Sequence, residues 1–242
     1  MSKGSGIAVV AALEREVRGL VKNWSVTEKE LGGRGFRFFE NGDLVVVCGG
    51  IGAEAARRAA EAVIATYAPR AIYSAGFAGG LDPALNVADI VQPRRVVNAG
   101  DGSSIDLGRG EGVLVTFGAV ASTEQKAKLR ESFGAQAVDM EAAAVGRAAE
   151  TRGVTFAVVK VISDEFDFNF PSTERFVDPN GQFLEGRFAW FAVVRPWLWP
   201  QVVRLARNSH RASRALCDWL RKNAESATSS SDVAVIEEVQ RR

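Results

Sequence analysis

The sequence has few of the residues that build disulfide frameworks or metal sites. Its 242 residues include two cysteines, Cys48 and Cys217, and a single histidine, His210. Two cysteines so far apart in the chain form neither a disulfide framework nor a cluster of metal ligands, so we expect a protein of the reducing cytoplasm without a metal. No stretch approaches the roughly 20 consecutive apolar residues of a membrane-spanning helix, and no secretory signal is predicted.

Net charge is nearly absent as well. The chain has 30 Lys and Arg residues against 29 Asp and Glu, a formal net charge of +1. Composition therefore predicts no overall attraction to nucleic acid or to an anionic membrane. The length is sufficient for one large domain, which we expect over residues 1–223. Residues 224–242 are rich in serine and then in mixed charge, which predicts a disordered tail.

Short apolar runs that alternate with helical patterns predict the fold class. Residues 7–12 and 71–75 are typical of buried strands, and each strand is neighboured by apolar residues at helical spacing. Asn41-Gly42 stands between two apolar runs, 35–40 and 43–48, and predicts an antiparallel hairpin. We therefore expect a single α/β domain with a mixed central β-sheet flanked by helices.

Two glycine clusters follow predicted strands. Residues 49–56, GGIGAEAA, imitate a dinucleotide-binding fingerprint, but the next strand ends without the acidic residue that binds ribose. A tight turn with close helix packing is the favoured interpretation, and no cofactor is predicted. The second cluster, Gly76–Gly80, either lets backbone approach a ligand closely or lets the chain turn.

Residues 137–167 place carboxylates where regular structure begins and ends. Asp139 and Glu141 stand at the start of an alanine-rich helix that Gly153 can end. Residues 154–162 then predict a strand covered on both faces. The strand brings Ser163 and Asp164 to its carboxyl end, where open α/β sheets bind ligands. The same pattern also fits two well-capped elements without a site.

The last third of the chain has a different character. Residues 168–182 predict an irregular loop able to cover a site, and 126–133 before it predict a charged surface helix. Residues 188–200, FAWFAVVRPWLWP, are the most aromatic stretch. Such a stretch is typical of a hydrophobic core or a dimer interface. The alternative is an exposed apolar surface that binds a hydrophobic substrate or makes peripheral contact with a membrane. Residues 201–223 predict an amphipathic helix with His210 on its solvated face.

Four segments in this order resemble one known family. They are AALEREV (11–17), GGIGAEAA (49–56), GFAGGLDPALNVADIV (76–91), and AVDMEAAAV with VVKVISDEFD (137–145 and 158–167). The pattern resembles the superfamily of purine nucleoside phosphorylases and methylthioadenosine/S-adenosylhomocysteine nucleosidases. Residues 177–183 and 195–209 are similar to the hopanoid-associated phosphorylases, whose implied task is to remove adenine from adenosylhopane. The resemblance implies a three-layer sandwich, a homodimer and cleavage of a purine N-glycosidic bond.

The resemblance also implies roles for particular residues. Asp164 matches the general acid to N7 of the purine, which must carry a proton when substrate is bound, as an enclosed apolar site favours. Ser163 would orient it. Glu141 matches the acceptor of hydrogen bonds from the ribose hydroxyls, Met140 would pack on the sugar, and Glu16 matches the glutamate that activates water. The segment with Gly76, Phe77 and Ala78 would form the wall beside the base.

Three positions bear on the choice between water and phosphate. Ser74 and Phe77 stand where many phosphorylases carry an arginine and a serine, so positive charge for phosphate is missing. Lys160 stands where nucleosidases carry arginine, and in so apolar a strand it needs an anionic partner. Hydrolysis is therefore favoured, and the aromatic run at 188–199 favours a 5′-substituted adenosine with an apolar substituent as the substrate. Phosphorolysis, and nucleoside binding without turnover, stay open as alternatives.

Overall fold

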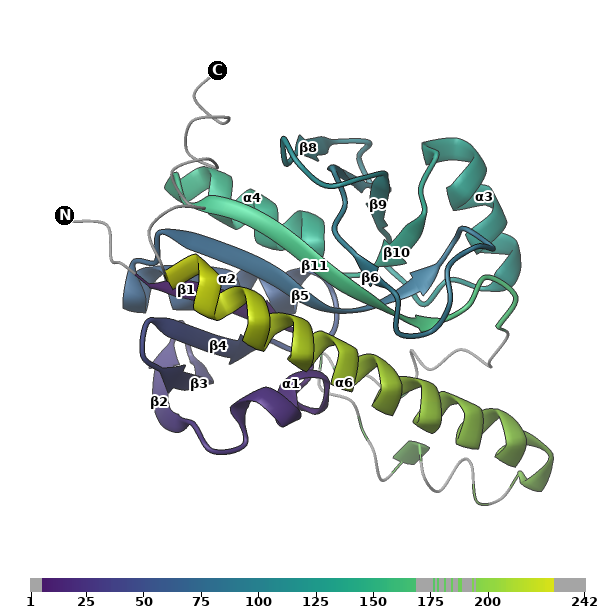
Figure 1. Cartoon of the computed structure of the whole chain (residues 1–242), viewed down its shortest axis with the longest axis horizontal. Helices are drawn as coiled ribbons and strands as arrows, with labels where there is room; N and C mark the ends of the chain where they lie inside the picture. Colours follow the sequence, from purple (N-terminus) through teal and green to yellow (C-terminus); the bar gives the residue numbers. More distant parts are fainter. Residues whose placement is uncertain are drawn as a thin grey trace.

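The chain folds around one twisted mixed sheet with helices on both faces (Figure 1). The computed structural model describes residues 6–168 and 195–228, the isolated residues 176, 178, 181, 184, 187, 188 and 193, and side-chain burial only as far as residue 223. The predicted α/β class with a mixed sheet is confirmed.

The sheet follows the order β2-β3-β4-β1-β5-β10-β9-β7-β8, and β11 pairs with β5 and β6. The strands are β1 (Ile7–Ala11), β2 (Ser25–Leu31), β3 (Arg34–Asn41), β4 (Leu44–Cys48), β5 (Ala71–Gly80), β6 (Ile90–Val91), β7 (Arg95–Asn98), β8 (Ser104–Asp106), β9 (Val113–Thr116), β10 (Ala137–Asp139) and β11 (Thr155–Asp164). The inner strands β4, β1, β5 and β11 pair in parallel and are mostly buried, whereas β2 pairs antiparallel with β3 at the edge and is largely exposed. The predicted hairpin at Asn41-Gly42 is β3 and β4, which pair antiparallel. The sequence did not predict β2, which extends this hairpin by one more antiparallel strand.

Strand β5 is the centre of the sheet. Its first half pairs in parallel with β1, β11 runs parallel along its length, and its end pairs antiparallel with β10. Gly76–Gly80, expected as a turn or a ligand-facing loop, belong to β5 itself. The strand is ten residues long, so it supports both the parallel core and the smaller group of β7 to β10.

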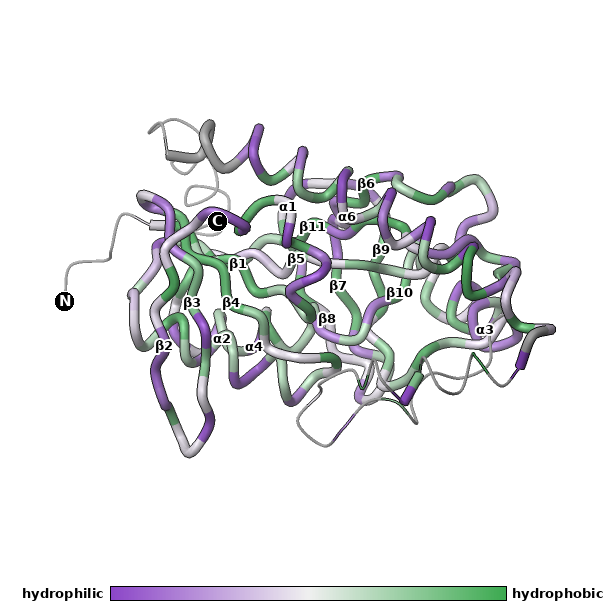
Figure 2. Tube along the Cα trace, turned by 90° about the horizontal axis from the view of Figure 1, so that it is seen from below, coloured by the Kyte–Doolittle hydropathy of each residue, from purple (hydrophilic) through white to green (hydrophobic). Residues whose placement is uncertain are grey.

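In the described part of the chain, two pairs of helices cover the sheet. They are α2 (Ala53–Tyr67) with α4 (Ala142–Arg152) on one face and α1 (Glu14–Val21) with α6 (Trp199–Thr228) on the other, while α3 (Thr123–Phe133) packs beside β9 and β10. Alanines on α2 and α4 let these helices approach each other and the strands closely. Figure 2 shows hydrophobic strands between helices whose outward turns are hydrophilic.

Several predictions about single segments need correction. The helix expected on the surface at 126–133 is α3, but its Lys126 side chain is only 2% exposed. The helix predicted over 201–223 is α6, which is longer at both ends and runs from Trp199 to Thr228. Most of 168–182 lies outside the described residues, and so does much of 188–200. Within the latter run, Trp197 and Trp199 are exposed, on the 3-10 helix η2 (Pro196–Leu198) and at the start of α6.

His210 is exposed on α6, as expected. Among the described residues, no helix is both long and apolar enough to cross a membrane.

Candidate active site

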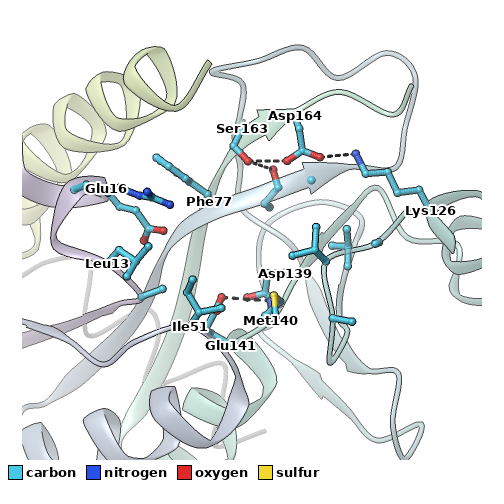
Figure 3. Close-up of a pocket in the computed structure, with 18 residues that line it drawn as sticks. Leu13, Glu16, Ile51, Phe77, Lys126, Asp139, Met140, Glu141, Ser163 and Asp164 are labelled. Atoms are coloured by element: carbon cyan, nitrogen blue, oxygen red, sulfur yellow. Dashed lines mark hydrogen bonds and ion pairs between the residues drawn. The ribbon is translucent and has the colours of Figure 1, made fainter. Parts of the chain in front are cut away.

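A pocket of about 200 Å³ lies at the carboxyl ends of β1, β5, β10 and β11. Figure 3 shows Glu16 on one side of it, Asp164 on another, and Glu141 at its base with Asp139 beside it. Most of the predicted site residues line it: Glu16, Phe77, Ala78, Met140, Glu141, Ser163 and Asp164. Gly76 and Lys160 do not line the pocket, but each lies against a residue that does.

Glu16 is a buried carboxyl in the first turn of α1. Its side chain reaches the pocket because β1 ends at Ala11 and the helix begins three residues later. Burial raises its pKa to about 7, and nearby Glu141 adds to the rise. Its Oε2 has no hydrogen-bond partner among the described residues. A buried acceptor that titrates near neutral pH is suited to taking a proton from a bound molecule.

Glu141 joins two segments that the sequence separates widely. Its Oε1 accepts a hydrogen bond of 3.0 Å from the backbone N–H of Gly52, which precedes α2 with φ +96°. The glycine cluster at 49–52, weighed above as a cofactor loop, thus holds a carboxylate of the pocket. Burial raises the pKa of Glu141, against the opposing effect of the Lys160 ammonium and with a further rise from Asp139.

Lys160 is neutralised by a buried partner. Its Nζ lies 2.8 Å from Oδ2 of Asp139 and 3.8 Å from Oε2 of Glu141, and Lys160 and Asp139 are almost fully enclosed. Burial alone would lower the pKa of Lys160, but these two carboxylates outweigh burial and raise it. Asp139 also accepts hydrogen bonds from the Thr116 hydroxyl and the Ala142 N–H, so it is fixed at the start of α4.

Asp164 ends β11 at an irregularity of the sheet. The register between β11 and β5 shifts between Ile162 and Asp164, and such bulges redirect side chains near functional sites. The Ser163 hydroxyl donates to Oδ1 of Asp164 at 2.8 Å, which is the orienting contact predicted for it. The prediction that Asp164 lies in an enclosed apolar site is wrong for this structure, because its side chain is 25% exposed and contacts a cation.

That cation is Lys126 of α3. Its Nζ donates to Oδ2 of Asp164 at 2.5 Å and to the backbone oxygen of Glu165 at 2.7 Å. Both oxygens of Asp164 are therefore engaged, and the plane of the carboxyl is set. Sequence reasoning missed Lys126, although the helical spacing that places it on one face with buried Leu129 was available as a signal. Asp139 was expected at a helix start only, and its pair with Lys160 was missed as well.

Two glycines of β5 make room for these contacts. A Cβ on Gly76 would lie 2.9 Å from Oε2 of Glu16, and a Cβ on Gly79 would lie 3.0 Å from Oδ2 of Asp164. The sequence indicated a close approach of backbone to a ligand here. In the structure the backbone approaches two carboxylates of the pocket instead.

Comparisons with a family model, with curated proteins and with solved structures all find phosphorylases or nucleosidases. The model of the "Phosphorylase superfamily" matches residues 6–113 and 110–182. A 5'-methylthioadenosine/S-adenosylhomocysteine nucleosidase from Marinomonas sp. (strain MWYL1) is 28% identical over 199 residues, which cover 66% of this chain and 86% of the relative. One from Staphylococcus aureus (strain JH9) is 25% identical over 196 residues, covering 65% and 86%. A crystal structure described as the MTA/SAH nucleosidase superposes with a TM-score of 0.70 at 17% identity, covering 96% of this chain and 98% of that one. This last likeness concerns the fold.

Proposed function

Since this chain belongs to the phosphorylase superfamily, we propose that it is an enzyme that hydrolyses the N-glycosidic bond of a purine nucleoside and releases adenine. The observation that carries the proposal is the placing of Glu16 and Asp164 on different sides of one pocket, with Glu141 between them at its base. Cleavage of a glycosidic bond needs a group that activates the nucleophile and a group that assists the leaving base. The named activities of the relatives support the same reaction.

Glu16 and Asp164 divide the proton transfers. A water held by Glu16 adds to C1′ of the ribose and gives one proton to Oε2, the oxygen that has no hydrogen-bond partner in the described part of the chain. The bond between C1′ and N9 breaks with its electron pair on the base, and N7 takes the proton that the Asp164 carboxyl carries once the substrate is bound. Lys126 then lies beside the carboxylate that forms, so its ammonium stabilises the charge left on Asp164.

Glu141 and Met140 bind the sugar in this proposal. The ribose hydroxyls donate to the Glu141 carboxylate, whose orientation is already set by the Gly52 N–H. Met140 packs on the ribose, and Phe77 with Ala78 forms the wall beside the base. Because the Glu141 carboxylate is already held by the hydrogen bond from the Gly52 N–H, it needs little further ordering when the substrate binds.

Water is favoured over phosphate as the nucleophile. Phosphate needs positive charge, and two cations near the pocket already have carboxylate partners: Lys160 pairs with Asp139, and Lys126 pairs with Asp164. Ser74 and Phe77 add no charge, and Ser74 is buried inside β5. Arg15 also lines the pocket, so phosphorolysis is the competing outcome that the product analysis must distinguish.

We further propose a 5′-substituted adenosine with an apolar substituent, of which adenosylhopane is one example. Leu13, Ile51 and Val120 give the pocket apolar walls in addition to Phe77. Burying an apolar substituent against apolar walls contributes roughly 25 cal/mol of favourable binding free energy for each Å² of apolar surface removed from water. The similarity of 177–183 and 195–209 to the hopanoid-associated branch supports the same substrate class.

The test is a product analysis. The purified protein is incubated with adenosine, 5′-methylthioadenosine and 5′-alkyl-substituted adenosines, each with and without phosphate, and the products are separated by chromatography. We expect free adenine and free sugar whether or not phosphate is present. A sugar 1-phosphate that appears only with phosphate would establish phosphorolysis instead, and nucleoside binding without free base would identify a non-catalytic binding protein.

Asp164→Asn tests the acid. An amide cannot give N7 a proton, so we expect adenine release to fall by at least about a hundredfold. The matched control is Asp167→Asn, an exposed carboxylate three residues further on. Full activity of Asp164→Asn would remove Asp164 from the mechanism.

A further inference from the structure

A second cavity lies between α1 and α6, on the outer side of the pair of helices that covers this face of the sheet. Its volume is about 560 Å³, within the range of small-molecule sites. It is formed by the side chains of the two helices, which pack against each other through Val17, Leu20, Leu216 and Leu220 beneath it. We call this cavity the basic cleft.

The basic cleft concentrates positive charge in a chain that is balanced as a whole. The full sequence has a formal net charge of +1. Among the residues that the structure describes, the cleft is lined by one carboxylate, Asp218, and five cationic side chains: Arg15, Arg18, Lys22, Arg214 and Arg221. Asp218 is engaged by Arg221 at 2.8 Å. The pair of Arg18 with Glu14 is long, at 3.9 Å, and both side chains are exposed.

Cations gathered around one cavity repel one another, and a bound anion offsets that repulsion. Arginine suits such an anion because its planar fork donates two hydrogen bonds to a phosphate at once. We propose that the basic cleft is a binding site for a phosphorylated ligand, separate from the proposed reaction pocket.

The basic cleft and the reaction pocket are separate cavities that both border the first turn of α1. Arg15 lines both cavities. Ser213 Oγ lies 3.0 Å from the backbone oxygen of Glu16 and 3.1 Å from that of Arg15, so a residue of the cleft holds the turn that carries the proposed base. An anion bound beside Arg15 therefore lies next to the turn that carries Glu16.

Phosphate groups reach a protein from two sources, a free phosphorylated molecule or a lipid headgroup, and the experiment separates them. Inorganic tripolyphosphate is titrated into the full chain by calorimetry. In parallel, cosedimentation is measured with vesicles of phosphatidylglycerol and, for comparison, of uncharged phosphatidylcholine. Tripolyphosphate binding without vesicle binding assigns a free ligand, and binding to phosphatidylglycerol vesicles assigns a headgroup.

The decisive variant carries Arg18→Gln and Arg214→Gln, which line the cleft but not the reaction pocket. We expect it to weaken the binding of whichever probe binds by at least about tenfold, since two charge-assisted hydrogen bonds are lost. The control carries Arg58→Gln and Arg147→Gln on α2 and α4, which removes the same charge from exposed helix positions outside the cleft.

Equal weakening in both variants would show attraction to overall charge and overturn the proposal, as would the absence of binding by either probe. Neither readout requires catalysis, so the proposal of the basic cleft is tested independently of the proposed hydrolysis.

Discussion

At the scale of single residues, the burial of Glu16 gives the proposed reaction a measurable pH dependence. Its pKa is raised from 4.5 to about 7, and only the ionised form accepts a proton from water. We therefore expect kcat/KM to fall as the pH drops below about 7. In Glu16→Gln we expect a loss of at least about a hundredfold, because an amide is no base. Glu14→Gln, a half-buried neighbour in the same turn, is the control.

The same shift predicts a change in stability. A carboxyl whose pKa is higher in the folded state makes the protein less stable as pH rises from about 4.5 to about 7, since folding then opposes its ionisation. Glu16→Gln removes this cost, so at pH 8 the variant should be more stable than the wild type, by up to about 3 kcal/mol. At pH 4 the two should be similar. Denaturant unfolding at both pH values measures the difference, and a variant less stable at pH 8 would contradict it.

Lys126 acts through Asp164 and is a positioning residue. Lys126→Met leaves Oδ2 of Asp164 without its partner, so we expect kcat to fall by about tenfold or more while KM changes little. Lys126→Arg, which keeps the charge, should restore part of the rate. Lys128→Met, two residues along α3 and exposed, should have almost no effect. Steady-state kinetics on the three variants distinguish positioning from a purely structural role. A purely structural role would lower the stability of Lys126→Met but leave the kcat of its folded protein unchanged.

At the scale of elements, β5 serves as both central strand and wall of the pocket. A Cβ on Gly79 would lie 3.0 Å from Asp164 Oδ2 and 3.3 Å from the Cε of Lys126. Gly79→Ala should therefore displace this pair, lower kcat, and destabilise the fold by about 1–3 kcal/mol through overpacking. Gly35→Ala on β3, where an added Cβ meets nothing within 4 Å, should retain full activity in the same kinetic and unfolding measurements.

At the scale of the whole molecule, the exposed residues at the start of α6 bear on assembly. Trp197, Trp199 and Val203 are more than half exposed, and exposed aromatic residues are enriched in subunit interfaces. With the homodimer that the family resemblance implies, we expect twice the chain mass of 26.0 kDa in light scattering. Substituting both tryptophans by serine should favour the monomer. Val26→Ser, at an exposed position on β2, should not change the mass.

The sequence by itself determined most of the elements and the carboxylates at their ends. Apolar runs, Asn41-Gly42 and Gly153 are local signals, and local signals report the backbone conformation of their own segment. The positions of Asp164 at the end of β11 and of Glu16 in the first turn of α1 follow directly from these signals. Their roles came from the resemblance to a family, since capped elements without a site give the same local pattern.

Only the tertiary structure decided which of these groups meet. Gly52 binds Glu141 across 89 residues and Lys126 pairs with Asp164 across 38, and no local pattern encodes contacts that arise when separate strand ends converge. Lys126 stands in the charged sequence TEQKAKLRESF, which predicts exposure until β9 and β10 are placed against the helix. The partners of the buried residues Lys126 and Lys160 also depend on the tertiary structure. Burial makes an ionic partner necessary, and the fold determines which carboxylate is within reach.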